Sequence, residues 1–313
     1  MRLLRAELAR LCARRFSRMM AIALLLALGV IAVVVAYNTH RPSAEELQRA
    51  ETEAADARLE CQQAQESLPE RERWDCGEIE ASQYVDYMLN FQDQMPELML
   101  GLGGLLALIG FLVGASFIGA EWSSGGLANL LLWRTQRISV LFAKLGAMLL
   151  ALTVTGVLVG AAWVATIWFI ASTRGEFGDL TEGFWISLGW DGARAIGLAL
   201  VAALTGMSIA SLGRRTAAAL GVLIGYIVVW EIGARLVMEG LRVRLSGAYM
   251  LSTYVGAWLA KEVELFDYRT CYEMDCDPYI LKLTWPWAAL VLGGLAALCL
   301  LVSAVSFQRR DVT

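Results

Sequence analysis

The stretch Leu98–Ala120, which reads LMLGLGGLLALIGFLVGASFIGA, decides the class of fold. It contains no Asp, Glu, Lys or Arg, and it has the roughly 20 apolar residues that a helix needs to cross a bilayer. The rest of the chain has the same character. Of its 313 residues, 58% are hydrophobic and 18% are charged, whereas soluble domains have roughly 45–50% and about 25%. The sequence therefore predicts a membrane protein.

Five further segments complete the predicted set of membrane spans. The uncharged part of one of them, Thr216–Trp230, would form a helix of only about 22 Å, which is too short to cross the bilayer. We therefore extend this span through Glu231 and Arg235. The sequence thus predicts an all-α membrane protein with six transmembrane helices, which are 98–120 and, in addition, 19–37, 145–172, 195–213, 216–238 and 283–308.

The segments that connect the spans differ in charge between the two sides of the membrane. One side has 13 Lys and Arg against 3 acidic residues, a net of +10, in segments 1–18, 121–144, 214–215 and 309–313. The other has 12 basic against 26 acidic residues, a net of −14, in segments 38–97, 173–194 and 239–282. Because short basic loops stay in the cytoplasm, both termini of this multi-pass protein are predicted to be cytoplasmic.

A cleaved signal peptide is the alternative interpretation of the first 37 residues. The basic start and the apolar run fit one, but about 19 apolar residues exceed the usual h-region of about 7–15. The stretch Ala36-Tyr37-Asn38 is also a poor cleavage site, since such sites have small residues. We therefore interpret 19–37 as the first membrane span.

The first 18 residues have helical amphipathic spacing. One arc of a helical wheel carries Leu4, Leu8, Leu11, Cys12 and Phe16, while most of the charged residues lie opposite. This pattern predicts a cytoplasmic amphipathic helix that lies in the membrane interface and leads into the first span.

Four of the six cysteines fall in the predicted outer segments. Thiols confined to the oxidising side of a membrane are typical of disulfides. We predict the pairs Cys61–Cys76 and Cys271–Cys276, although four cysteines allow three pairings. A structural zinc site is the alternative, and the single histidine of the chain argues against it.

The outer segment 38–97 begins with a helix signal. The residues Ser43-Ala-Glu-Glu46 have the form of a capping box, in which the two outer side chains bond to each other's backbone N–H groups. Glu, Ala, Arg and Leu then dominate through Gln65, which predicts a solvated helix. This extracytoplasmic segment is either a structural helix or an outward binding or gating cap.

Two pairs of opposite charge lie at the predicted outer ends of spans. Asp191 and Arg194 are three residues apart, and Glu231 and Arg235 are four apart, so each pair is spaced to meet on one helix face. Charges at membrane depth are costly and often functional. Structural pairing and a role in a substrate path both remain open.

Motifs for chemistry on this chain are absent. None of the three lysines, Lys144, Lys261 and Lys282, follows a glycine, so there is no P-loop for ATP. The one histidine, His40, excludes an H-E-x-x-H metalloprotease site. We expect no catalytic residues, no metal and no cofactor on this chain, and no nucleic-acid partner.

The predicted cytoplasmic segment 121–144 reads EWSSGGLANLLLWRTQRISVLFAK. Gly125 and Gly126 permit a sharp turn. The apolar run that follows is too short to span a bilayer, and an apolar surface on a cytoplasmic loop needs something to cover it. The alternative is that Trp122 and the leucines lie among lipid headgroups.

This segment resembles the membrane subunits of ATP-binding-cassette (ABC) exporters of the type-2 permease family. That family has a Glu–Trp pair, a Gly, a leucine-rich turn, an Arg and then a Lys in this order, matched here by Glu121, Trp122, Gly125, Leu130, Leu131, Arg137 and Lys144. The family often has a proline just before that arginine, where this chain has Trp133-Arg134-Thr135-Gln136.

The resemblance implies a function and a set of partners. The segment would couple the permease to a separate ATPase subunit, which binds the ATP and Mg²⁺, and Arg134 and Arg137 would meet acidic groups or helix C-termini. The resemblance further implies a second permease, as an identical copy or a paralogue, in the lipid bilayer of a bacterial plasma membrane. The apolar composition favours export of hydrophobic or amphipathic cargo. A membrane sensor or assembly subunit is the alternative, and a secondary transporter comes third.

Overall fold

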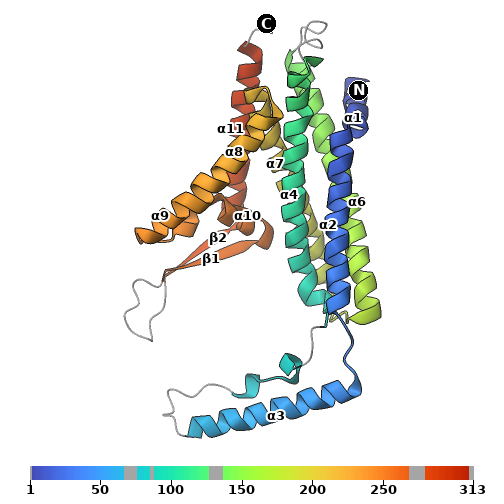
Figure 1. Ribbon diagram of the computed structural model, residues 1–313, viewed down its shortest axis with the longest axis vertical. Helices are drawn as coiled ribbons and strands as arrows, with labels where there is room; N and C mark the ends of the chain where they lie inside the picture. Colours follow the sequence, from blue (N-terminus) through green and yellow to red (C-terminus); the bar gives the residue numbers. More distant parts are fainter. Residues whose placement is uncertain (1, 67–75, 85–87, 127–136, 268–278, 310–313) are drawn as a thin grey trace. The chain divides into compact units, whose positions relative to one another are not determined.

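The computed structural model describes residues 2–66, 76–84, 88–126, 137–267 and 279–309 and is mostly helical (Figure 1). The longer described helices are α1 (Arg2–Ala13), α2 (Arg15–Asn38), α3 (Ala44–Glu66), α4 (Phe91–Ser123), α6 (Arg137–Arg174), α7 (Glu182–Gly213), α8 (Thr216–Tyr226), the π-helix η4 (Ile227–Ala234), α9 (Arg235–Gly240), α10 (Leu251–Ala260) and α11 (Trp285–Arg309). Short 3-10 turns are η2 (Cys76–Glu78), η3 (Ala81–Tyr84) and η5 (Ser246–Tyr249).

Six of the described helices are long and apolar enough to cross a membrane, which confirms the predicted number of spans at the level of length and composition. They are α2, α4, α6 from Ile138, α7, the continuous run Thr216–Gly240 and α11. Several begin before the segments expected from the absence of charge. Helix α7 already begins at Glu182, so much of the predicted outer loop 173–194 is helical. Asp191 and Arg194 are accommodated inside it because they pair with each other at 2.9 Å.

The expectation of an all-α protein is wrong in one place. Strands β1 (Glu262–Asp267) and β2 (Tyr279–Thr284) form an antiparallel pair, in which Val263 lies opposite Leu283 and Glu264 opposite Lys282. Alternating polar and apolar residues favour a strand with one protected face. Leu283 packs with Ala257 of α10 and Ala288 of α11, and this small apolar cluster covers that face.

The chain divides into two compact units. Unit 1 comprises 1–27, 96–161 and 183–313, and unit 2 comprises 28–95 and 162–182. In unit 1, α4 and α7 approach so closely that a Cβ added at Gly114 would collide with the carbonyl oxygen of Ala203. Small residues allow such backbone contact between membrane helices. The contact builds the buried core of this unit, which includes Phe117, Met148 and Met207.

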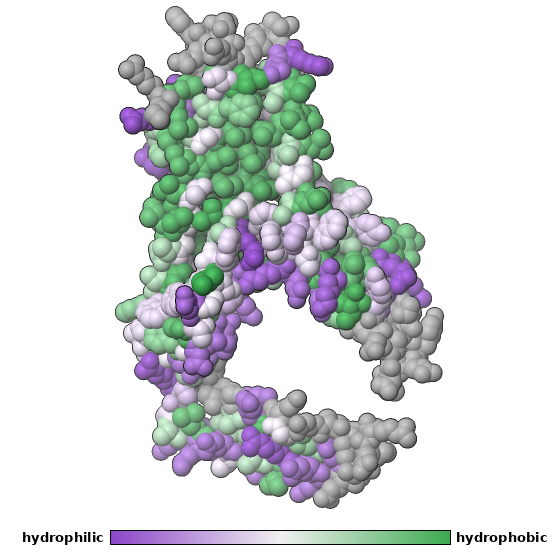
Figure 2. Space-filling view, turned by 180° about the vertical axis from the view of Figure 1, so that it is seen from behind, coloured by the Kyte–Doolittle hydropathy of each residue, from purple (hydrophilic) through white to green (hydrophobic). Residues whose placement is uncertain are grey.

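Apolar side chains also cover the outside of the unit 1 helices (Figure 2). Leu25 and Leu26 of α2 are 58% and 64% exposed, and Leu298 and Leu301 of α11 are 59% and 64% exposed. An apolar surface of this extent is not stable in water. It fits helices that are surrounded by lipid.

Unit 2 contains α3 and the ends of three of the long helices. The predicted capping box is confirmed, since Ser43 N–H donates to Glu46 Oε2 at 2.6 Å and Glu46 N–H donates to Ser43 Oγ at 3.3 Å. The disulfide Cys61–Cys76 is confirmed as well. Cys271 and Cys276 lie outside the described residues, so their pairing stays a prediction.

Candidate functional site

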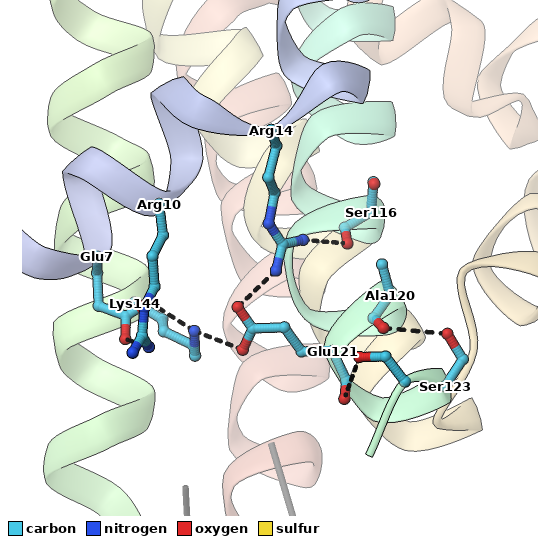
Figure 3. A network of polar contacts seen from close by, with 9 residues as sticks. Glu7, Arg10, Arg14, Ser116, Ala120, Glu121, Ser123 and Lys144 are labelled. Atoms are coloured by element: carbon cyan, nitrogen blue, oxygen red, sulfur yellow. Dashed lines mark hydrogen bonds and ion pairs between the residues drawn. The ribbon is translucent and has the colours of Figure 1, made fainter. Parts of the chain in front are cut away.

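The side chain of Lys144 is fully buried near the start of α6 (Figure 3). Its Nζ lies 2.6 Å from Glu7 Oε2 and 2.6 Å from Glu121 Oε2. Glu7 belongs to α1 and is also buried, with 1% of its side chain exposed, and Glu121 is in the last turn of α4. A charge buried without a partner is very unfavourable, so these two carboxylates explain how a lysine is tolerated here.

Arg14, the single residue between α1 and α2, also contacts Glu121. Its guanidinium donates to Glu121 Oε1 at 2.5 Å and to the backbone carbonyl of Ser116 at 3.0 Å. Two carboxylates and two cations therefore balance, and we call Glu7, Arg14, Glu121 and Lys144 the charge network. Arg10, which is half exposed, adds a further contact to Glu7 at 2.9 Å.

An aromatic ring lies beside both cations of the charge network. The Phe117 ring centroid is 4.8 Å from Lys144 Nζ and 5.0 Å from the Arg14 guanidinium carbon. Cations over an aromatic face are attracted to its π electrons, most strongly where water is excluded. Phe117 thus stabilises the two cations and keeps solvent away from them.

Trp122, the residue after Glu121, packs within its own chain. Its ring meets Phe307 of α11 edge to face at 5.9 Å, and the guanidinium of Arg214 lies 5.0 Å from the ring centroid. Arg214 is in the short turn between α7 and α8, with φ of 55°. The ends of α4, α7 and α11 and the start of α8 therefore meet near the charge network, and we call this region the basic end of unit 1.

Helix α4 extends past the predicted span 98–120 and ends at Ser123. Gly125 has φ of 70°, in the left-handed region that favours glycine, and its N–H donates to the carbonyl of Trp122. A left-handed glycine after the last helical turn is a common way to end a helix. The chain therefore leaves α4 directly after Glu121 and Trp122.

Some of the predicted coupling residues lie outside the described residues. Leu130, Leu131 and Arg134 do so entirely, and of Arg137 only the backbone, at the first position of α6, is described. Glu121 and Lys144 flank this stretch in sequence and are brought together by their ion pair. The two ends of segment 121–144 are thus joined directly.

Sequence reasoning did not find Glu7 and Arg14. Glu7 is the only acidic residue among the first 18, and this is the signal that was available. A single carboxylate in a strongly basic amphipathic segment indicates a specific cationic partner. Here the partner is Lys144, which lies 137 residues away in the sequence.

The predicted outer charge pairs have different outcomes. Asp191 and Arg194 pair as expected, and Lys261 Nζ lies 3.4 Å from the same carboxylate. The prediction that Glu231 pairs with Arg235 is wrong. Glu231 instead accepts hydrogen bonds from the Tyr226 hydroxyl and from the N–H and hydroxyl of Ser252, and Arg235 pairs with Glu239. The π-helix η4 changes the spacing on which the i,i+4 argument rests.

None of these arrangements forms a metal centre within the described parts of the chain. No group of three or more His, Cys, Asp or Glu side chains gathers there in a way that would hold a metal ion. The charge network is internally neutralised, with Glu7 and Lys144 buried and Arg14 and Glu121 partly exposed. Its ion pairs hold α1, α4 and α6 together.

The six apolar helices define a multi-pass membrane protein. Helix α1 is joined to one of them, α6, by the ion pair Glu7–Lys144. Residues 11–312 match a family model described as "ABC-2 family transporter protein". The chain belongs to this family of ABC transporter membrane subunits, which confirms the resemblance. Permeases of this family work with ATPase subunits. A comparison with curated proteins gives no match.

Proposed function

We propose that this chain is the permease subunit of an ABC exporter for hydrophobic or amphipathic cargo, and that segment 121–144 docks on the ATPase. The family membership supports the transporter class. The basic end of unit 1, with both termini, would face the cytoplasm, in agreement with the charge difference of +10 against −14. ATP would then be hydrolysed on the partner chain.

The observation that carries this proposal is the ion pair between Glu121 and Lys144. It joins the last turn of α4 directly to α6, the two helices between which segment 121–144 runs. Because the two helices are joined, a displacement of one would be passed on to the other. Glu7 and Arg14 join α1 to the same two helices.

Coupling requires that the docked ATPase favours one of two permease conformations. A partner shifts such an equilibrium only by as much as its affinities for the two states differ. In the proposed mechanism, a movement of the docking segment displaces the ends of α4 and α6 together with α1, because buried ion pairs are too costly to break. The outward or inward arrangement of the spans then follows the state of the ATPase.

A second permease chain fits the exposed face of the run Thr216–Gly240, which is almost entirely unburied within this chain. Val228, Val229, Leu236 and Val237 are each more than half exposed there. Lipid also covers apolar helices, so this surface supports a second copy or paralogue without choosing between them. Cargo would pass between the two chains.

The experiment is co-purification of this chain with an ABC ATPase subunit expressed in the same cells. We expect Leu131→Asp and Arg137→Glu to insert at the parental level, to retain several-fold less ATPase and to lower substrate-stimulated ATP hydrolysis. Matched changes on the exposed face of α3, Leu59→Asp and Arg49→Glu, serve as controls and should behave like the parent. If both docking variants bind the ATPase and hydrolyse ATP like the parent, segment 121–144 is not the coupling element. If the parent chain binds no ATPase, the sensor interpretation replaces the permease.

A further inference from the structure

A cavity of about 260 Å³ lies among five helices of unit 1. Helices α1 and α2 form one side, and α4, α6 and α7 form the others. Its walls are almost wholly apolar, with side chains such as Leu24, Leu106, Ile109, Val113 and Leu152. Leu24 and Val113 are buried, so the cavity extends into the helix bundle.

The polar groups of the cavity are concentrated where α1 turns into α2. Cys12, Ser17 and Arg18 line it there, and Arg18 is exposed to solvent. One guanidinium nitrogen of Arg18 donates to the carbonyl of Ala13 at 3.3 Å, which holds the side chain at this turn. The cavity thus combines a mostly apolar interior with one cationic group, one thiol and two hydroxyls, the second of which belongs to Thr155 of α6.

We propose that this cavity binds an acyl chain of an anionic phospholipid, with the phosphate at Arg18 and Ser17. The apolar walls lie within spans that hydrocarbon surrounds, so a lipid chain is the occupant closest at hand. Arg18 is the one cation that lines the cavity, and a cation near the membrane surface attracts an anionic headgroup by about 1 kcal/mol. A guanidinium binds phosphate well because its donors are arranged in a planar fork.

The site has a consequence for the charge network. The bound chain would contact α1 and α2 on one side and α4, α6 and α7 on the other. It would therefore hold α1 in place, and α1 carries Glu7, which contacts Lys144. This inference does not depend on the proposed coupling role, since lipid binding is measured on the permease alone.

The experiment measures retained lipid. The full chain is reconstituted in mixed phosphatidylglycerol and phosphatidylcholine, extracted in mild detergent and analysed by native mass spectrometry. We expect retained phosphatidylglycerol to fall about fivefold in Arg18→Gln, which corresponds to one lost charge contact. Ala151→Phe, which fills the cavity, should abolish retention.

Two matched variants serve as controls. Arg15→Gln removes a neighbouring exposed cation, and Val154→Phe enlarges a lipid-facing residue of α6. Neither residue lines the cavity. Both variants should retain phosphatidylglycerol like the parent.

Cys12 gives a second readout that does not depend on extraction. It is a free thiol on the cavity wall, and bound phosphatidylglycerol should slow its modification by a maleimide, as located by peptide mapping. The free thiol of Cys299, which does not line the cavity, should react at a rate independent of lipid. Equal retention in all variants, equal retention of phosphatidylcholine, or a non-lipid amphiphile in place of phospholipid would each overturn the proposal.

Discussion

Lys144 shows how one residue determines the arrangement of three helices. Its ammonium group has no access to water, so it depends on Glu7 and Glu121 for its stability. The three groups come from α6, α1 and α4. The two ion pairs form only when all three helices are in place. Buried charges of this kind favour one register of the helix ends over its alternatives.

Replacing Lys144 with Met should therefore destabilise the protein. Breaking a buried ion pair by removing one partner typically costs about 3–5 kcal/mol. Arg10 and Arg14 still pair with Glu7 and Glu121 after the substitution, so we expect a cost at or below the lower end of this range. We expect a clear fall in the unfolding temperature of the detergent-solubilised chain, measured by fluorescence-detected size exclusion after heating. The double variant Glu7→Gln with Lys144→Met should recover part of the loss.

The control for this prediction is Lys282→Met. Lys282 also makes a 2.6 Å ion pair, with Glu264, but its side chain is 59% exposed. Exposed pairs contribute about 0–1 kcal/mol, so this variant should unfold near the parental temperature. An equal effect of the two lysine substitutions would show that burial of the charge network is not what stabilises the basic end.

At the scale of elements, the N-terminus of α3 gives a prediction about pH. The Ser43 N–H that donates to the Glu46 carboxylate lowers the pKa of Glu46 below its ordinary value of 4.5, and the Ser43 side chain adds to this. Because the folded pKa is lowered, the cap stabilises the helix fully above the unfolded pKa. That contribution is lost as the pH falls through the folded pKa.

The measurement is amide hydrogen exchange at the start of α3 in the parent and in Glu46→Gln. At pH 7 the parent should be better protected than the variant, and at a pH well below the lowered pKa the two should become equal. Comparing the proteins at the same pH removes the intrinsic dependence of exchange on pH. A difference that persists at low pH would mean that the carboxylate does not cap this helix.

The elements differ in how well the sequence predicts them. The six spans follow from uncharged runs such as Leu98–Ala120, because the requirement of the bilayer is local and depends only on length and polarity. The sequence does not predict the hairpin β1–β2, because each strand has only six residues and their pairing is a contact that local composition does not specify. Helix α7 begins well before the uncharged run 195–213, because the ion pair Asp191–Arg194 lies inside the helix.

The candidate site was predictable only in part, for the same physical reason. Glu121 and Lys144 are found from the local pattern of segment 121–144, but the pairing of Lys144 with Glu7 is a tertiary contact. No periodicity links residues 137 positions apart. A local pattern can also mislead. The spacing of Glu231 and Arg235 suits an α-helix, but a π-helix forms there, and the two residues do not pair.

At the scale of the whole molecule, we propose different roles for the basic end of unit 1 and for the segments predicted to face outward. The basic end carries the charge network and the ends of segment 121–144. Residues of the hairpin β1–β2 belong to the segments predicted to face outward. If ATP hydrolysis on the cytoplasmic side drives the permease, the ATPase must contact the basic end of unit 1 and not the hairpin β1–β2.

Site-specific photo-crosslinking in cells identifies the region of the permease that the ATPase contacts. A photoreactive residue is placed at Ser124, which is exposed beside Glu121, or at Tyr279 of β2, which is 52% exposed. We expect the ATPase to be crosslinked from Ser124 and not from Tyr279, and Leu131→Asp to weaken the Ser124 product. Crosslinking of the ATPase from Tyr279, or from neither position while the complex co-purifies, would contradict this expectation.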